Sequence, residues 1–329
     1  MSDLNDCFAA ELLAKQILPD LGDILQIFYS LGTLLVLIIC VYKYKQHKIP
    51  IHPNFLLIAA NLILLYIYHS VGSIAICIRY QFVIRYYTDP CEILTPVWLN
   101  VLLLSTQYIY TQAFVLSHFA LTTERIRATI ALKTYETQGL CYSIFCLTIV
   151  WTLTLLTTAA IIITACFDPA FSKPLIHTTF TTSSNSSYLI ALNFILLFIV
   201  ICTAILDYII IVKNRNNKKR GSAYDLNKRY QINENVVTMR LILPLDIAFA
   251  LFFSIYMAST LVLRSARSSL TPGQFYSIFN IASSLLHLHS LVSLLIYLYY
   301  TKIIKSRVLM VNPEKQAAIY FVHLRSQWA

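Results

Sequence analysis

Two adjacent residues of opposite charge, Glu124 and Arg125, directly follow a long apolar stretch in the segment LSHFALTTERIRATI. An arginine guanidinium forms strong charge-assisted hydrogen bonds with carboxylates. Arg125 can therefore pair with an acid in one conformation and bind a partner protein in another. The candidate acids are the adjacent Glu124 and, on another predicted helix, Glu234 and Asp246. The alternative is that Arg125 only extends to lipid phosphates.

Polar side chains also line one face of the helix that this segment predicts. At 100° per residue they fall within an arc of about 60°, and the row is about 27 Å long. The residues of this row are Gln107, Thr111, His118, Thr122 and Arg125. Because polar groups are costly in lipid, we expect this face to point into a helix bundle. Ordinary hydrogen bonds between helices are the alternative explanation.

Other predicted helices carry shorter rows of polar residues. Asp246 stands two residues after Pro244, and proline removes a backbone donor and can kink a helix. An acid in such a position needs a polar partner. The other two rows are Asn193, Thr203 and Asp207, and Asn280, Ser283, Ser284 and His287.

The composition predicts that these helices form a membrane protein. Of the 329 residues, 58% are hydrophobic and only 12% are charged. Seven stretches are long enough to cross a hydrocarbon core, which needs about 20 apolar residues. We therefore predict an all-α membrane protein, a bundle of seven transmembrane helices. The predicted spans are 22–42, 54–78, 97–121, 141–165, 188–212, 241–263 and 275–300.

The basic residues predict the orientation of this bundle. Of the 25 Lys and Arg residues, 19 would lie on one side and six on the other. Because cytoplasmic loops are enriched in Lys and Arg, residues 1–21 are predicted to be extracellular and the tail 301–329 cytoplasmic. The basic charge therefore indicates contact with membrane lipid, and we expect no nucleic-acid partner. The six residues of the sparser side are Lys15, Arg79, Arg85, Lys173, Arg264 and Arg267.

Three cysteines, Cys7, Cys91 and Cys166, would lie on the extracellular side, where disulfides form. We predict a bond between Cys91 and Cys166 that attaches the loop before the fifth span to the third span. Cys7 and Cys77 remain possible competitors, because sequence alone does not give connectivity. The same loop carries a sequon at Asn185, which predicts glycosylation, although its closeness to the fifth span weighs against it.

The quoted segments resemble those of G-protein-coupled receptors, and more closely the nematode serpentine chemoreceptors of class alpha or alpha/beta. LSHFALTTERIRAT resembles the end of their third span, and KIPIHPNFLLIAAN the start of their second. The most specific segment, YDLNKRYQINENVVTMRLILPL (224–245), resembles their cytoplasmic stretch before the sixth span. Two features differ from rhodopsin-like receptors: Ile126 replaces the usual Tyr, and the seventh span has no Asn-Pro-x-x-Tyr.

The resemblance implies a chemosensory receptor in the plasma membrane of a sensory neuron, at the cilium. Its partners would be a small-molecule chemical cue and a heterotrimeric G protein, with no cofactor or bound metal. The candidate ligand contacts are Gln107, Thr111, Asn193, Asn280 and Ser284. The candidate coupling residues are Glu124, Arg125, Tyr230, Gln231, Glu234, Asn235, Pro244 and Asp246.

Two other classes of protein remain to be weighed. A ligand-gated seven-span channel would have its N-terminus in the cytoplasm, which the distribution of Lys and Arg opposes. An enzyme or transporter would need catalytic or repeat motifs, and the sequence has no H-E-x-x-H, G-x-S-x-G or P-loop. His287 and His289 are two residues apart, so on a helix they cannot share a metal ion.

Overall fold

The computed structural model describes residues 7–8, 10–12, 15, 17–46, 52–131, 135, 139–168, 171, 185–220, 226–266, 269–270 and 272–309. Within these ranges only the backbone is described for 17–20, 218–220, 226–231, 233, 264, 272–273, 276 and 303–309. The predicted side-chain roles of Tyr230 and Gln231 therefore lie outside the described residues.

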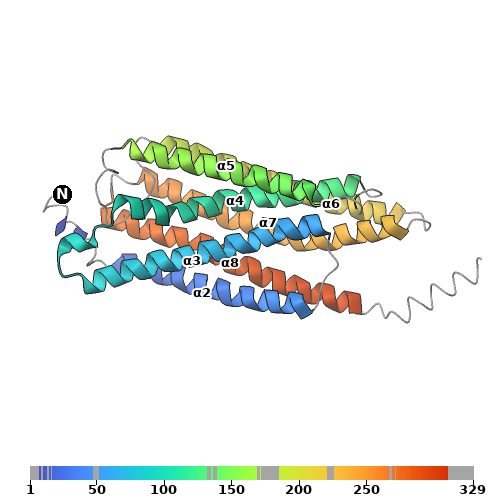
Figure 1. Cartoon of the computed structure of the whole chain (residues 1–329), viewed down its shortest axis with the longest axis horizontal. Helices are drawn as coiled ribbons and strands as arrows, with labels where there is room; N and C mark the ends of the chain where they lie inside the picture. The colour runs from blue at the N-terminus through green and yellow to red at the C-terminus, as the bar shows by residue number, and fades with distance from the viewer. Residues whose placement is uncertain are drawn as a thin grey trace, which may run out of the picture.

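Seven long helices and one short 3-10 turn follow helical residues 7–8 and 10–12 in the described part of the chain. The long helices run side by side along the longest axis of the molecule (Figure 1). Each of the seven predicted spans lies within one of them. The elements are α2 (Ile17–Gln46), α3 (Pro53–Tyr86), η1 (Pro90–Ile93), α4 (Val97–Ile130), α5 (Cys141–Cys166), α6 (Ser186–Arg220), α7 (Leu226–Ser265) and α8 (Pro272–Leu309).

The helices close into a ring in the order α2, α3, α4, α6, α7 and α8, with α8 packed against α2. α5 lies outside this ring against α4 and α3. α4 contacts α3, α5, α6 and α7. A polar side chain on α4 can therefore find partners on several helices, as the sequence predicted for its polar row.

Six of the described helices are long and apolar enough to cross a membrane by length and composition. They are Leu21–Gln46, Pro53–Tyr86, Cys141–Cys166, Ser186–Asn217, Glu234–Leu263 and Ser277–Lys302. α4 has 34 residues, as many as α3, but it is not among these six. Its many Asn, Gln, Ser and Thr residues reduce its apolar character. Several of them are buried: Asn100, Gln112, Ser117, Thr122 and Thr129.

The distribution of side chains is that of a protein surrounded by lipid. Arg125 and Asp207 are fully buried, whereas Phe145 and Leu156 of α5 are 61% and 63% exposed. Polar groups inside and large apolar groups outside reverse the usual pattern of soluble proteins. This arrangement supports the predicted membrane class and explains why the ionisable residues of the spans meet inside the bundle.

The local sequence explains where α3 begins and why α7 starts before its apolar part. α3 starts with Pro53 at its first position, where a missing backbone N–H costs nothing. The Nδ1 atom of His52 accepts the backbone N–H of Asn54 at 3.2 Å. α7 begins 15 residues before the predicted span, at Leu226, and continues through Pro244. Residues 228–240 contain no Gly or Pro, so nothing in this segment interrupts the helix.

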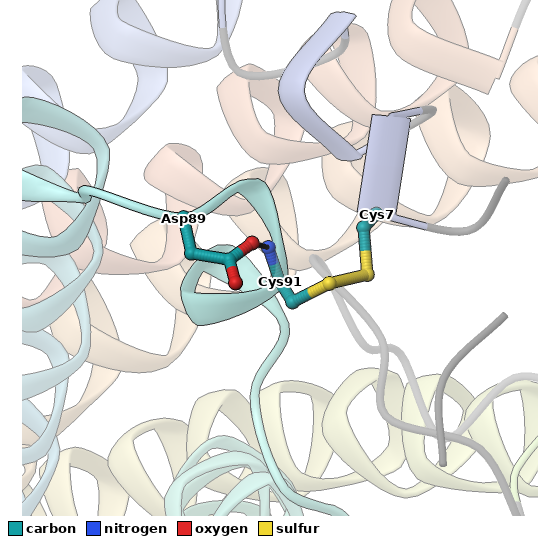
Figure 2. The surroundings of a disulfide bond; sticks show 3 residues. All are labelled: Cys7, Asp89 and Cys91. Atoms are coloured by element: carbon teal, nitrogen blue, oxygen red, sulfur yellow. Dashed lines mark hydrogen bonds between the residues drawn. A yellow bond between two sulfur atoms is a disulfide. The ribbon is translucent and has the colours of Figure 1, made fainter. Parts of the chain in front are cut away.

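The disulfide joins Cys7 to Cys91, so the predicted Cys91–Cys166 bond is wrong in this structure (Figure 2). Cys166 is a free, exposed thiol. The Asp89 carboxylate accepts the Cys91 N–H at 2.9 Å and caps η1, and the N-terminal segment packs against this turn. The sequence alone could not exclude Cys7 as a disulfide partner, because the pairing depends on where the N-terminal segment packs. We call the end of the bundle with this bond the disulfide end.

Other contacts at the disulfide end also attach the N-terminal segment to the bundle. Tyr87, which follows α3, donates its hydroxyl to Glu11 Oε1 at 3.0 Å. Hydrogen bonds from Lys15 and Tyr87 lower the pKa of the half-buried Glu11 carboxyl. Asn185 immediately precedes α6, and its side chain is 1% exposed. A glycan needs an accessible amide, so this burial argues against the predicted glycosylation.

Candidate functional site

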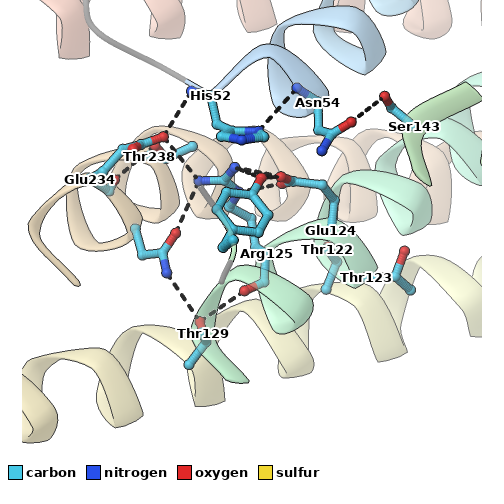
Figure 3. A network of polar contacts seen from close by, with 12 residues as sticks. His52, Asn54, Thr122, Thr123, Glu124, Arg125, Thr129, Ser143, Glu234 and Thr238 are labelled. Atoms are coloured by element: carbon cyan, nitrogen blue, oxygen red, sulfur yellow. Dashed lines mark hydrogen bonds and ion pairs between the residues drawn. The ribbon is translucent and has the colours of Figure 1, made fainter. Parts of the chain in front are cut away.

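The Glu124–Arg125 pair lies at the opposite end of the bundle, which we call the Arg125 end. Both side chains are fully buried. Arg125 Nη2 donates to Glu124 Oε1 at 2.7 Å, and Nε donates to Oε2, so the pair is bidentate (Figure 3). A planar guanidinium matches a carboxylate in this way. Burial distinguishes this arrangement from an arginine that only extends to lipid phosphates.

Helix α7 supplies further partners for the guanidinium. Arg125 Nη1 donates to Asn235 Oδ1 at 3.0 Å and lies 3.7 Å from Glu234 Oε1. Of the three acids that sequence offered, Glu124 and Glu234 therefore contact Arg125. The pair on α4 is thus connected to the part of α7 that precedes the predicted sixth span.

Residues from the neighbouring connections complete the enclosure. Tyr135, which lies between α4 and α5, donates its hydroxyl to Glu124 Oε1 and accepts from Arg125 Nη2 at 3.2 Å. The backbone N–H of His52 donates to Glu234 Oε1 at 2.9 Å. The Phe55 ring of α3 lies 4.9 Å from the Arg125 Cζ atom. α3 and α7 therefore meet around the same guanidinium.

Thr129 extends these contacts to α6. Its Oγ1 donates to the Arg125 carbonyl at 2.8 Å and accepts from Asn214 Nδ2 at 3.0 Å and Asn235 Nδ2 at 3.5 Å. We call the whole group the Arg125 cluster. It consists of Glu124, Arg125, Thr129, Tyr135, Asn214, Glu234 and Asn235.

The Arg125 cluster is suited to holding helices together rather than to catalysis. Its charges are paired with each other and hydrogen-bonded to neutral groups, and Arg125 has no exposed surface. Removing one partner of a buried ion pair costs about 3–5 kcal/mol, because the other charge is left uncompensated. A conformation in which α7 moves away would have to provide other partners for Arg125.

Asp246 belongs to a second group, so the suggestion that it pairs with Arg125 is wrong in this structure. Its Oδ1 contacts His118 Nδ1. His118 precedes Arg125 by seven residues on α4, a separation of about 10 Å along the axis. Thr122 donates to Asp207 Oδ1 of α6 at 2.7 Å. The predicted polar face of α4 therefore contacts both α6 and α7.

A third polar group, at the disulfide end, was not predicted from sequence. Asp23 and Gln26 of α2 contact Asn280 of α8: Asn280 Nδ2 donates to Asp23 Oδ1 at 2.6 Å, and Gln26 Nε2 to the Asn280 carbonyl at 3.1 Å. Gln81 of α3 donates to Asp23 Oδ2 at 3.3 Å. The charge of Asp23 within an apolar stretch was the signal that could have identified this group.

The five predicted ligand contacts do not form one cluster. Asn280 takes part in the Asp23 group, and the Ser284 hydroxyl donates to the Ile281 carbonyl at 2.7 Å. The Thr111 hydroxyl donates to the Gln107 carbonyl at 2.9 Å. The other three candidates lie in the halves of α4 and α6 that are closer to the disulfide end. They are half-buried: Gln107, Thr111 and Asn193.

Histidines form a separate group in the middle of the bundle. The His69 ring stacks between Tyr110, at a centroid distance of 3.8 Å, and His287, at 4.2 Å. His289 faces Phe114 and Phe249 instead. In the described part of the chain, no group of three or more His, Cys, Asp or Glu could hold a metal ion. His287 and His289 thus point to different neighbours, as their spacing predicted.

Comparison with known proteins gives one match that covers nearly the whole chain. The family described as serpentine-type 7TM GPCR receptor class ab chemoreceptor matches residues 14–329. No curated protein matches the sequence. The matched region includes all seven long helices, the Arg125 cluster and the partner groups of Asp207, Asp246 and Asp23.

Proposed function

We propose, because the chain belongs to the class ab family of serpentine seven-transmembrane chemoreceptors, that it detects a small molecule and activates a heterotrimeric G protein. The observation that carries this proposal is the Arg125 cluster. It connects α4 and α7 directly, and through Thr129 and His52 it reaches α6 and α3. A polar group that holds several helices at one end is the kind of element that a signalling change can open.

The proposed orientation places the Arg125 end in the cytoplasm of a cell and the disulfide end outside. The connections α2–α3, α4–α5 and α6–α7 lie at the Arg125 end. By sequence position, 19 of the 25 Lys and Arg residues belong to these connections, the helix ends beside them and the tail, within residues 43–53, 122–140, 213–240 and 301–329. In this arrangement α4, the third helix along the chain, also crosses the membrane, and burial against other helices makes polar residues such as Gln112 and Thr122 tolerable. The Cys7–Cys91 bond then lies in an oxidising compartment.

In the proposed mechanism, the cue binds nearer the disulfide end, with Gln107, Thr111, Asn193, Asn280 and Ser284 as candidate contacts. Binding favours a bundle in which α7 has separated from Arg125, leaving Glu234 and Asn235 without that partner. Tyr230, Gln231 and the freed Arg125 are then candidates for contact with the G protein. A shift from 1:99 to 99:1 between the two states requires about 5.5 kcal/mol of differential binding.

Agonist-free signalling in a heterologous cell tests this role without knowledge of the cue. We expect Asn235→Ala to raise basal G-protein activation, because it removes the bond from α7 to Arg125 Nη1. Arg125→Ala should abolish activation per molecule at the surface, and an epitope tag measures the surface level by which the signal is divided.

Arg127→Ala is the matched control. Arg127 is two residues further along α4, is half-buried and stacks on Tyr142 at 4.3 Å, outside the Arg125 cluster. It should signal as the unaltered chain does. An Arg125→Ala protein that reaches the surface and signals normally would show that the proposed role of Arg125 is wrong.

A further inference from the structure

Two buried carboxyl groups, Asp207 of α6 and Asp246 of α7, meet in the middle of the bundle. Their residues are 0% and 2% exposed. The two carboxyl groups contact successive turns of the same face of α4, Asp246 through His118 and Asp207 through Thr122, and they interact with each other. Ionised carboxylates only accept hydrogen bonds, so a bond between two carboxyl groups requires that one of them carries a proton.

The hydrogen-bond partners leave one oxygen of each group unsatisfied. Thr122 donates to Asp207 Oδ1 at 2.7 Å, and His118 Nδ1 contacts Asp246 Oδ1. The Oδ2 atoms of both residues are buried and have no partner. A buried polar atom without a partner costs about 1–3 kcal/mol. A proton shared between the two carboxyl groups would supply a hydrogen bond that neither group can make when both are ionised.

The surrounding charges do not compensate two negative carboxylates. Among the described residues, neither Asp207 nor Asp246 forms an ion pair with Lys or Arg. Among the titratable groups near the pair, His118 of α4 contacts Asp246. Tyr66 of α3 interacts electrostatically with Asp246, and His289 of α8 with His118. Two like charges this close in a low-dielectric interior repel each other strongly, and carboxyl pairs of this kind hold one proton instead.

We propose that Asp207 and Asp246 share a single proton at neutral pH and that the resulting O–H···O⁻ bond joins α6 to α7. The pair then carries one negative charge, which accepts the N–H of a neutral His118 and the Thr122 hydroxyl. Loss of the proton to water leaves two carboxylates that repel each other and separate the two helices. The site binds a proton rather than a metal ion, in keeping with the described residues around it.

Infrared spectroscopy of the full chain in lipid nanodiscs tests the proposal and needs no G protein or cue. At about pH 8, solvent-exposed carboxyl groups are ionised and lack the C=O stretch of the protonated acid. We expect one such band to persist, to shift in D₂O and to move on ¹³C-aspartate labelling. Absence of this band from the unaltered chain would overturn the proposal even if every variant failed to fold.

Two substitutions assign the band to this pair. Asp207→Asn and Asp246→Asn should each remove it, because the asparagine amide N–H replaces the shared proton and the remaining aspartate ionises. Asp23→Asn is the matched control and should leave the band unchanged. Asp23 is also buried, but Asn280 and Gln81 donate to its two carboxylate oxygens.

A titration with sodium at constant ionic strength separates a proton from a cation. Replacing choline with sodium in the buffer should leave the band unchanged if the site holds a proton. Loss of the band with rising sodium, or its survival in both aspartate variants, contradicts the shared-proton site. These outcomes are independent of signalling, so they do not depend on whether the proposed receptor function is correct.

Discussion

At the residue scale, the contact that completes the Arg125 cluster comes from Tyr135. Its hydroxyl serves both members of the ion pair, as donor to Glu124 and acceptor from Arg125. Its ring also lies 4.1 Å from the His52 ring between centroids. One phenol from a short connection thus satisfies two buried charged groups and contacts the residue that caps α3.

Tyr135→Phe isolates this hydroxyl, since the ring remains. We expect a loss of about 1–3 kcal/mol in stability, the usual cost of leaving buried polar groups unpaired. Thermal unfolding of the purified chain in nanodiscs measures it as a lower midpoint. Tyr86→Phe, at a position that is 70% exposed on α3, is the control and should unfold as the unaltered chain does. Equal midpoints for all three proteins would contradict the importance of the Tyr135 hydroxyl.

The sequence predicted those features of a residue that depend only on its own position in a helix, and not the identity of its partners on other helices. The Glu124–Arg125 pair, the polar face of α4 and the need of Asp246 for a partner all follow from sequence position and the cost of burying charge. The partners themselves do not. His118 became the partner of Asp246, and Tyr135 that of Glu124, because of how α4 and α7 pack and how a connection folds back. Neither fact has a signal in residue spacing.

At the element scale, close packing of α3 against α4 depends on Gly72. A Cβ atom at this position would lie 3.0 Å from Thr106 Oγ1 and 3.1 Å from Thr106 Cβ. Small residues at such crossings allow helix backbones to approach closely in membranes. α4 is the polar helix that the others must cover, so the fit at Gly72 helps to keep its side chains away from lipid.

Gly72→Ala should therefore destabilise the bundle even though alanine favours helices. Forcing an extra methyl group into a packed interface typically costs about 1–3 kcal/mol. We expect a lower unfolding midpoint and a reduced amount of protein at the cell surface. Gly139→Ala is the matched control, because a Cβ there meets nothing within 4 Å. If the two alanine variants behave alike, the α3–α4 crossing is looser than the structure shows.

At the scale of the whole molecule, the long helices were predictable from the sequence, but the disulfide between Cys7 and Cys91 was not. Apolar length identified every long helix, and the absence of Gly and Pro from residues 228–240 indicated that α7 extends beyond its apolar part. The disulfide depends instead on where the N-terminal segment packs. It closes a sequence separation of 84 residues and attaches that segment to the turn between α3 and α4.

Cys7→Ser should weaken this attachment. Removal of a native disulfide from a small secreted domain typically costs about 2–5 kcal/mol, and we expect a loss of stability here as well. Peptide mapping under non-reducing conditions should find Cys7 linked to Cys91 in the unaltered chain and in Cys166→Ser. Loss of thermal stability should follow Cys7→Ser or Cys91→Ser but not Cys166→Ser, whose thiol is free and exposed. A recovered Cys91–Cys166 peptide would restore the pairing that sequence favoured.

In the proposed function, the orientation of the bundle decides which end meets the chemical cue and which end meets the G protein. The Arg125 end carries most of the basic residues, so it should face the cytoplasm, where Lys and Arg are enriched in loops. An epitope tag within residues 1–20 should be stained on intact cells, and a tag at 221–225 only after permeabilisation. Protease added to sealed cells should cleave the first segment and spare the second. The reverse pattern would place the Arg125 cluster outside, where no G protein can reach it, and would favour a channel of inverted topology.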